Sequence, residues 1–249
     1  MGITNEDKTF FIAFSFCSSE SAASFIFFFD SLRAEFFNTY VPEPTVVLLD
    51  LAASIISAFD THKAMPHSKL QFCSWHVEEA IQGRFSNVGR YTKQEIIGWT
   101  DKNTSIEHNG LKHYIWCYIQ SNTKAELDTN RANLLSLLQV EEQRYLTDNY
   151  LSKEQRFVAC YTHRLKNLGQ TATQRSESYY RVLKDVTHYK LSLEESAKAL
   201  YVKLNNIYTR LAIAEDQAAL NRFTAIDLNF FRLLVGSVSL FAIKRIQAE

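Results

Sequence analysis

Two short apolar runs with a helical pattern between them restrict the fold of this chain more than any other feature. Thr45 to Leu49 is a continuous run of the kind found in parallel strands that are buried on both faces. Leu51 to Phe59 has helical spacing, and Leu70 to Cys73 is the second short run. Strand, helix and strand in this order predict a parallel unit within an α/β sheet.

The segment before this unit predicts another strand and a helix. Thr9 to Phe16 is β-branched and aromatic, and Gly2-Ile3-Thr4 is the stub of a hairpin partner joined to it through a turn at Asn5-Glu6-Asp7. Ser18-Ser19-Glu20 offers a helix start. Apolar residues then recur at helical spacing through Phe37, and this stripe favours a packed core over a cofactor pocket.

After Cys73 the strand signals disappear. Val77 to Gln170 has an almost wholly helical pattern, which predicts a helical layer packed beside the sheet. Leu193 to Ala214 predicts a long helix, and Phe230 to Ile246 predicts a final one. The chain therefore consists of an α/β part followed by a large helical part.

Composition narrows the class of protein. With 249 residues and 46% hydrophobic side chains, the chain can bury a substantial core. Lysine plus arginine (27) equals aspartate plus glutamate (27), so any nucleic-acid contact requires a local basic patch. The four cysteines lack the spacing of a secreted disulfide scaffold, which favours a reducing compartment with mostly buried, free thiols. No secretion signal is found at Met1 to Lys8, and Phe230 to Ile243 is too short to span a membrane.

Two carboxylates stand where metal-dependent chemistry would need them. Asp50 directly follows the first apolar run, at the strand end where open α/β sheets build their sites. Glu177 lies in a predicted helix that could deliver a second carboxylate to the same edge. Oxygen ligands of this kind suit Mg²⁺ or Mn²⁺, and two such ions can catalyse phosphoryl transfer. Taken alone, an Asp after a strand is more often a helix cap or turn residue, and a Glu in a helix more often belongs to a solvated face.

The order of several motifs resembles the transposase domain of Mutator-like elements. The matching segments are Gly2-Ile3-Thr4, Thr9 to Phe16, Leu49-Asp50, Cys73-Ser74-Trp75-His76-Val77, Gly169 to Thr173 with Arg175, Glu177 and Ser178, and Leu234 to Ile246. The resemblance implies a ribonuclease H-like mixed sheet with a large all-α insertion and C-terminal helices. It also implies that Asp50 and Glu177 are catalytic metal ligands for Mg²⁺ or Mn²⁺.

The same resemblance implies a division of the chain and a set of partners. Residues 1–90 would form the first part of the core, 91–169 the helical insertion, 170–190 the helix with the catalytic Glu, and 191–249 a C-terminal helical segment. The partner would be DNA at the terminal repeats of the element, in the nucleus, with a homo-oligomer left open and no membrane. Metal-dependent DNA strand cleavage and transfer is the activity of the intact family.

One departure from the family limits this expectation. The first catalytic Asp of the family lies on its first strand, which we expect to be absent here together with most of the second strand. Asp7 cannot replace that residue, because it lies in the hairpin turn. In a sheet ordered 3-2-1-4-5 this loss would expose strand edges, and we expect impaired catalysis. The alternatives are a non-enzymatic DNA-binding regulator, like the plant far-red-impaired transcription factors, or an inactive structural remnant.

Two further groups of residues need an interpretation. Cys73 and His76 are expected to be a structural pair or to support the metal ligands; a zinc site completed by His62 and His67 is the weaker alternative, so zinc is not expected. Arg175, Arg181 and Lys184 surround Glu177 and are candidate DNA contacts. An ordinary amphipathic helix surface explains these cations equally well.

Overall fold

The structure is a computed structural model, and it describes residues 1–4, 7–37, 41–100, 107–184, 187, 191–221 and 242. The chain divides into two compact units, Met1–Phe16 with Gln174–Glu249 and Cys17–Thr173. We call them the terminal unit and the central unit and describe each by itself. The helix predicted for Phe230 to Ile246 lies outside the described residues, apart from Ala242.

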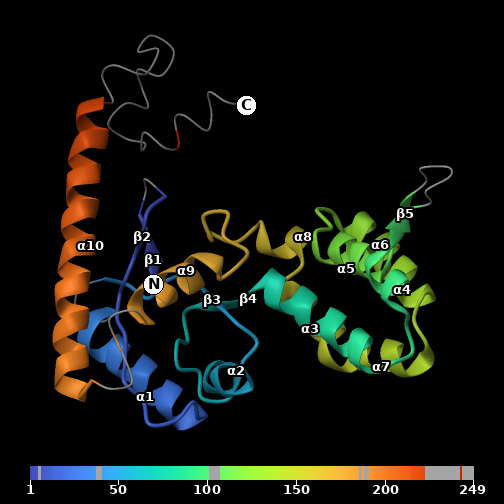
Figure 1. Cartoon of the computed structure of the whole chain (residues 1–249), viewed down its shortest axis with the longest axis horizontal. Coiled ribbons are helices and arrows are strands. Elements are labelled where there is room, and N and C mark those ends of the chain that lie inside the picture. The colour runs from blue at the N-terminus through green and yellow to red at the C-terminus, as the bar shows by residue number, and fades with distance from the viewer. Residues whose placement is uncertain are drawn as a thin grey trace. The chain divides into compact units, whose positions relative to one another are not determined.

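The described part of the chain is mostly helical and contains three two-stranded sheets (Figure 1). One sheet is the predicted parallel pair and one is the predicted N-terminal hairpin. Mixed α/β content is therefore confirmed, whereas the ribonuclease H-like architecture and the four-part division stay predictions. No helix in the described residues is both long and apolar enough to span a bilayer.

The terminal unit is built on the N-terminal hairpin. Strand β1 (Gly2–Ile3) pairs antiparallel with β2 (Thr9–Phe10). The prediction of a strand from Thr9 through Phe16 was wrong, because β2 ends at Phe10. Within the described part of the chain, residues 11–16 pair with no strand. Helix α9 (Gln174–Lys184) and helix α10 (Leu193–Asn221) complete the described part of this unit.

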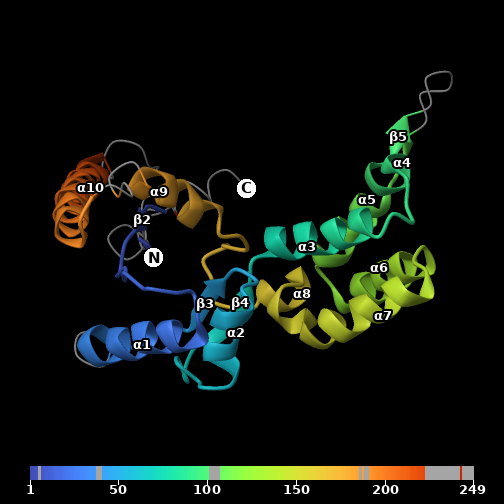
Figure 2. The ribbon, with the colours of Figure 1, turned by 60° about the horizontal axis from the view of Figure 1, so that its bottom comes forward.

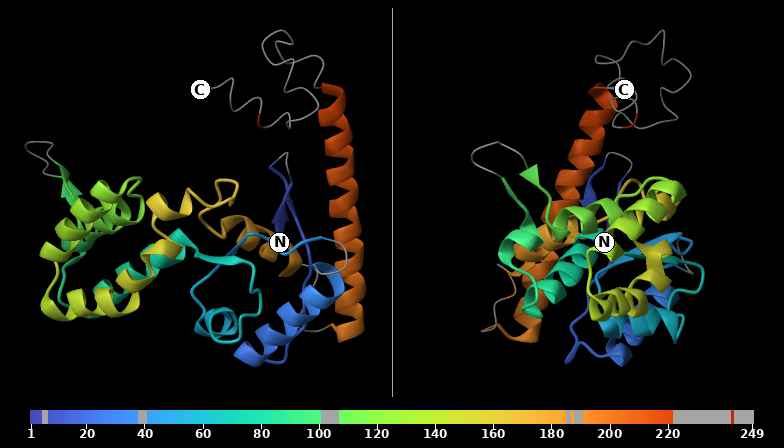
Figure 3. Two further views of the ribbon diagram at one scale, coloured as in Figure 1. Left: turned by 180° about the vertical axis from the view of Figure 1, so that it is seen from behind. Right: turned by 90° about the vertical axis from the view of Figure 1, so that its right-hand side faces the viewer.

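Phe11, directly after β2, contacts both helices. The rings of Phe11 and Tyr179 on α9 meet edge to face with centroids 5.5 Å apart. The Tyr208 hydroxyl on α10 donates a hydrogen bond to the carbonyl of Phe11, and α10 accordingly runs beside β2 in both views of Figure 3. Phe11 is buried, and through these two contacts the hairpin segment meets both α9 and α10.

The central unit begins with α1 (Ala22–Leu32), which continues as one π-helical turn (Arg33–Phe37). The predicted start at Ser18 to Glu20 is slightly too early, because Ser21 is the N-cap and its hydroxyl accepts the Ser24 N–H at 3.3 Å. Strand β3 (Val46–Leu49), helix α2 (Ala53–Asp60) and strand β4 (Lys69–Phe72) follow (Figure 2). The helix α1 packs against α2.

Strands β3 and β4 form the predicted parallel pair, in the register Val46–Lys69 to Leu49–Phe72. Full burial of β3 was the wrong expectation: Leu49 is buried, but Val46, Val47 and Leu48 are only half-buried. Among the described residues β3 has a single partner strand, so its other edge and parts of both faces are not covered by sheet.

Residues 74–162 form the helical part of the central unit. It contains α3 (Ser74–Asn87), α4 (Lys93–Ile97), α5 (Leu111–Ile119), α6 (Lys124–Ser136), α7 (Val140–Asn149), a 3₁₀ helix (Leu151–Arg156) and α8 (Ala159–Thr162). The helical prediction for Val77 to Gln170 is confirmed for most of the described residues. The exceptions are a small antiparallel pair, β5 (Trp99–Thr100) with β6 (Glu107–His108), and the turns of residues 163–170. Capping boxes at Thr92 and Thr123 fix the starts of α4 and α6.

One apolar cluster joins these helices to the parallel strands. It includes Phe72 at the end of β4, Ile81 and Phe85 on α3, and Ile115 and Tyr118 on α5. Ile81, Phe85, Ile115 and Tyr118 are completely buried. Because Phe72 belongs to the same cluster, burial of these side chains also fixes the carboxyl end of β4.

Candidate functional site

The carboxyl ends of β3 and β4 form one edge, which we call the carboxyl edge. The last paired residues are Leu49 and Phe72, and the Cys73 N–H continues the ladder by donating to the Leu49 carbonyl at 2.8 Å. Asp50 therefore directly follows the last residue of β3, and Cys73 directly follows the last residue of β4. The sequence predicted this placement of Asp50 correctly, because parallel strands bring their carboxyl ends to one edge.

Asp50 is exposed at this edge. Its Oδ1 accepts the N–H of Ala52, the N-cap residue of α2, at 3.1 Å. Within the described part of the chain, no hydrogen bond reaches Oδ2. One oxygen of the exposed Asp50 side chain thus stabilises the turn before α2, and the other accepts no hydrogen bond from the described residues.

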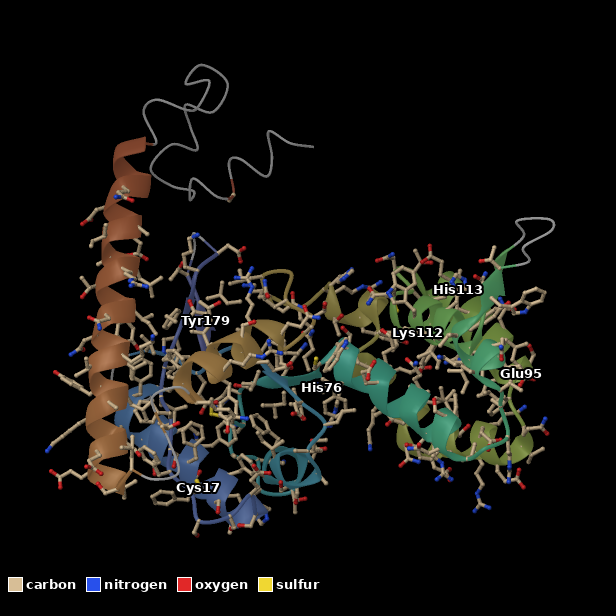
Figure 4. All side chains as sticks on the ribbon, viewed as in Figure 1. Cys17, His76, Glu95, Lys112, His113 and Tyr179 are labelled. Carbon is tan, nitrogen blue, oxygen red and sulfur yellow. The ribbon has the colours of Figure 1, made fainter. Side chains whose placement is uncertain are left out.

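Cys73 and His76 hold the segment that leads into the helix of Glu177. The Thr173 N–H donates to Cys73 Sγ at 3.3 Å, and the Thr173 hydroxyl lies 3.3 Å from His76 Nδ1. Cys73 is completely buried, and His76 is labelled at the first turn of α3 in Figure 4. Both contacts are those of a structural pair; a role in supporting metal ligands stays a prediction.

Sequence reasoning did not find the polar residues that strengthen this attachment. Ser74 donates its N–H and its hydroxyl to the Thr171 carbonyl, at 2.9 and 3.0 Å. Gln71 is 1% exposed, donates to the Gln170 carbonyl at 3.0 Å and accepts from Asn167 at 2.9 Å. A glutamine inside an apolar strand is the sequence signal that could have identified this connection.

A tight turn delivers the chain to this edge. Leu168 and Gly169 both have left-handed backbone conformations, with φ of 54° and 73°. Glycine adopts this conformation without strain, whereas an exposed leucine does so only when its surroundings enforce it. The Asn167 side chain provides part of that enforcement, because its oxygen accepts the Gly169 N–H at 3.0 Å.

Replacing Gln71 with leucine is expected to lower the free energy of unfolding by about 2 kcal/mol, because Asn167 and the Gln170 carbonyl lose a buried partner. Urea unfolding measures this loss. Amide exchange should also quicken at residues 170–173. The exposed Gln94 makes a matched control as Gln94→Leu, and equal effects of both substitutions would refute the role assigned to Gln71.

Helix α9 presents Glu177 and two cations on one exposed face. Glu177, Arg181 and Lys184 are spaced by four and three residues, which places them on one side of a helix, and all three are exposed. The Lys184 ammonium lies 4.9 Å from the centre of the Tyr180 ring. This face combines one carboxylate with two cations and an aromatic ring.

Arg175 points to the other face of α9, within the terminal unit. Its guanidinium donates to the Asp7 carbonyl at 2.8 Å and to the Asp7 carboxylate at 2.7 Å. Asp7 has a left-handed backbone, with φ of 58°, in the hairpin turn where the sequence placed it. Arg175 therefore anchors α9 to the hairpin, and its expected contact with DNA stays a prediction.

The described residues contain no group of three or more His, Cys, Asp or Glu side chains that could hold a metal ion. Asp50 belongs to the central unit and Glu177 to the terminal unit, so their predicted meeting at one edge stays a prediction. Their carboxylate oxygens suit Mg²⁺ or Mn²⁺ in type.

Comparison with known families adds evidence on the segment that carries Asp50. Residues 1–80 match the MULE transposase domain. The match covers β1 through the first half of α3, including Asp50, Cys73 and His76, and ends before Glu177. The expected relation to Mutator-like transposases is thereby confirmed for the MULE-matching segment.

One curated relative extends beyond that segment. The chain is 23% identical over 216 residues to Protein FAR-RED IMPAIRED RESPONSE 1 of Arabidopsis thaliana. The aligned part is 86% of this chain but only 24% of the relative, so the chain spans about a quarter of that protein. No solved structure matches the chain.

Proposed function

We propose that this chain is a DNA-binding domain of the Mutator-like transposase type, with a ribonuclease H-like core. The observation that carries the proposal is the position of Asp50, which follows a parallel strand inside the MULE-matching segment. The observed strand pairs also support it. In the order 3-2-1-4-5, strands two and three are neighbours, as β1 and β2 are, and strands four and five are neighbours, as β3 and β4 are.

In this proposal Asp50 and Glu177 are the carboxylates that would hold Mg²⁺ or Mn²⁺, and the ion would supply charge neutralisation for phosphoryl transfer. Thr173, held by Cys73 and His76, supports this assignment, because α9 begins with the next residue. The partner would be the terminal repeats of the element, and the compartment would be the nucleus.

A second function is favoured by the relative that aligns with 86% of the chain. A transposase-derived regulator would bind DNA without cutting it. Arg181 and Lys184, the two exposed cations of α9, could contact DNA phosphates equally well in that role. Binding of Mn²⁺ that is lost in Asp50→Ala and in Glu177→Ala would favour the first function, because the second needs no metal ligands. Binding of duplex DNA is common to both.

Reversing the charges of Arg181 and Lys184 is expected to weaken binding of duplex DNA at least tenfold, because both cations are exposed on the face of α9 that carries Glu177. Fluorescence anisotropy with a terminal-repeat duplex, at several salt concentrations, measures the change. Each lost phosphate contact should reduce the salt slope by about 0.9. The control is Lys198→Glu, on an exposed turn of α10. Unchanged affinity of the Arg181→Glu/Lys184→Glu variant would remove the α9 face from the proposal.

A further inference from the structure

A basic pocket lies in the central unit, at the end of the parallel strands opposite the carboxyl edge. It has a volume of about 640 Å³. Lys69, the first residue of β4, lies at its wall, together with Lys63 from the loop after α2 and Arg164 from the segment after α8. Four residues of parallel strand separate this end from Asp50, a span of roughly 10 Å.

The pocket carries an excess of positive charge. Four cations line it against one carboxylate, Asp60. Arg156 neutralises that carboxylate with two hydrogen bonds, of 2.8 and 2.9 Å. Lys63, Lys69 and Arg164 make no ion pair within the described part of the chain. Three cations are therefore available to an anionic ligand.

The floor of the pocket is apolar and aromatic. Met65 is 3% exposed, Phe59 is buried, and Leu70 and Leu165 are half-buried. Tyr161 lies in the lining and is also half-buried. The lining thus combines three exposed cations with apolar side chains and a tyrosine. This combination suits a ligand that has both phosphates and flat apolar rings.

The loop that carries Lys63 is held in place. Lys63 has a left-handed backbone, with φ of 47°, a conformation that costs free energy for a residue with a side chain. The Ser68 hydroxyl donates to the Pro44 carbonyl at 2.6 Å, and the Ala64 N–H donates to the Ala58 carbonyl at 3.2 Å. Since these bonds fix the loop in advance, a ligand would meet a largely ordered wall.

We infer that this pocket binds a single-stranded segment of nucleic acid, with phosphates on Lys63, Lys69 and Arg164 and a base against Tyr161. The inference rests on the proposed function, because it takes nucleic acid as the ligand. A single strand is the occupant because its bases are free to enter a concave pocket and stack on a ring. A duplex keeps its bases paired inside and offers the pocket only its backbone. The pocket lies at the end of β3 and β4 opposite Asp50, and its lining contains no residue of α9.

The test is binding of a fluorescein-labelled single-stranded 20-mer to the full 249-residue chain, followed by anisotropy. Lys69→Glu/Arg164→Glu is expected to bind at least tenfold more weakly than wild type and to lose about 0.7 of salt slope for each phosphate contact. Lys93→Glu/Arg144→Glu, which reverses two exposed charges elsewhere in the same unit, should keep wild-type affinity. Tyr161→Leu should weaken binding without changing the salt slope, because it removes an aromatic ring and no charge. Should Lys69→Glu/Arg164→Glu fail to fold, Lys69→Gln/Arg164→Gln takes its place.

The outcomes separate this inference from the proposed function. Wild-type affinity in the pocket variant overturns the inference, and so does an equal loss in the Lys93→Glu/Arg144→Glu control. In either case, duplex binding that depends on Arg181 and Lys184 leaves the proposed function standing. If wild type binds neither the single strand nor the duplex, the DNA-binding function fails and the inference fails with it.

Discussion

Replacing Glu154 with alanine is expected to lower the free energy of unfolding by about 3 kcal/mol. Glu154 is 6% exposed and accepts hydrogen bonds from the Tyr118 hydroxyl at 3.0 Å and from Arg131 at 2.9 Å. Its removal leaves the buried Tyr118 hydroxyl without this acceptor and leaves the Arg131 guanidinium with Asp128 as its remaining carboxylate, at 2.6 Å. Breaking a buried pair of this kind costs about 3–5 kcal/mol. Arg131 keeps some access to water, which favours the lower end of that range. Urea unfolding followed by circular dichroism measures the change.

Two variants make this result specific. Glu141→Ala removes an exposed carboxylate that pairs with Arg90, and we expect a much smaller change than for Glu154→Ala, because solvent screens the pair. Tyr118→Phe removes only the buried hydroxyl, so it should cost less than Glu154→Ala. Burial and the charge of Glu154 both raise the pKa of Tyr118, which therefore remains a hydrogen-bond donor at neutral pH. Equal unfolding free energies for Glu141→Ala and Glu154→Ala would refute the buried network.

The second large effect is the expected absence of DNA cleavage by residues 1–249. The family that the sequence resembles uses three carboxylates in a two-metal site, and Asp50 and Glu177 match two of those motif positions within residues 1–249. A missing ligand that costs several kcal/mol lowers the rate about a thousandfold or more. Purified protein incubated with supercoiled DNA and Mn²⁺ should therefore leave the DNA at the background level of nicking.

Asp50→Ala and Glu177→Ala provide the controls for this assay, and both should match wild type. Glu79→Ala, an exposed carboxylate on α3, controls for general charge effects. Nicking that requires Mn²⁺ and disappears in both Asp50→Ala and Glu177→Ala, but persists in Glu79→Ala, would contradict the expectation. It would show that the two proposed ligands suffice, or that a second copy supplies a third.

Local patterns in the sequence determined the order of elements in this protein. The run ending at Leu49, the helical spacing after Leu51 and the second run ending at Phe72 each depend on neighbours within a few residues, and periodicity reports such neighbours directly. The same holds for α9 and for the helices between residues 74 and 162. Asp50 could be placed at the carboxyl edge for this reason, since its position follows from the strand before it.

Only the tertiary structure decided what surrounds those elements. Gln71 and Gln170 are 99 positions apart, Arg175 and Asp7 are 168 apart, and Arg156 and Asp60 are 96 apart. No local pattern encodes such pairs, because each depends on where distant segments pack. The half-burial of β3 and the short β2 have the same cause: how many partner strands an element finds is a property of the whole sheet. The sequence thus determined which elements form, and packing between distant segments determined which polar and charged groups they bring together.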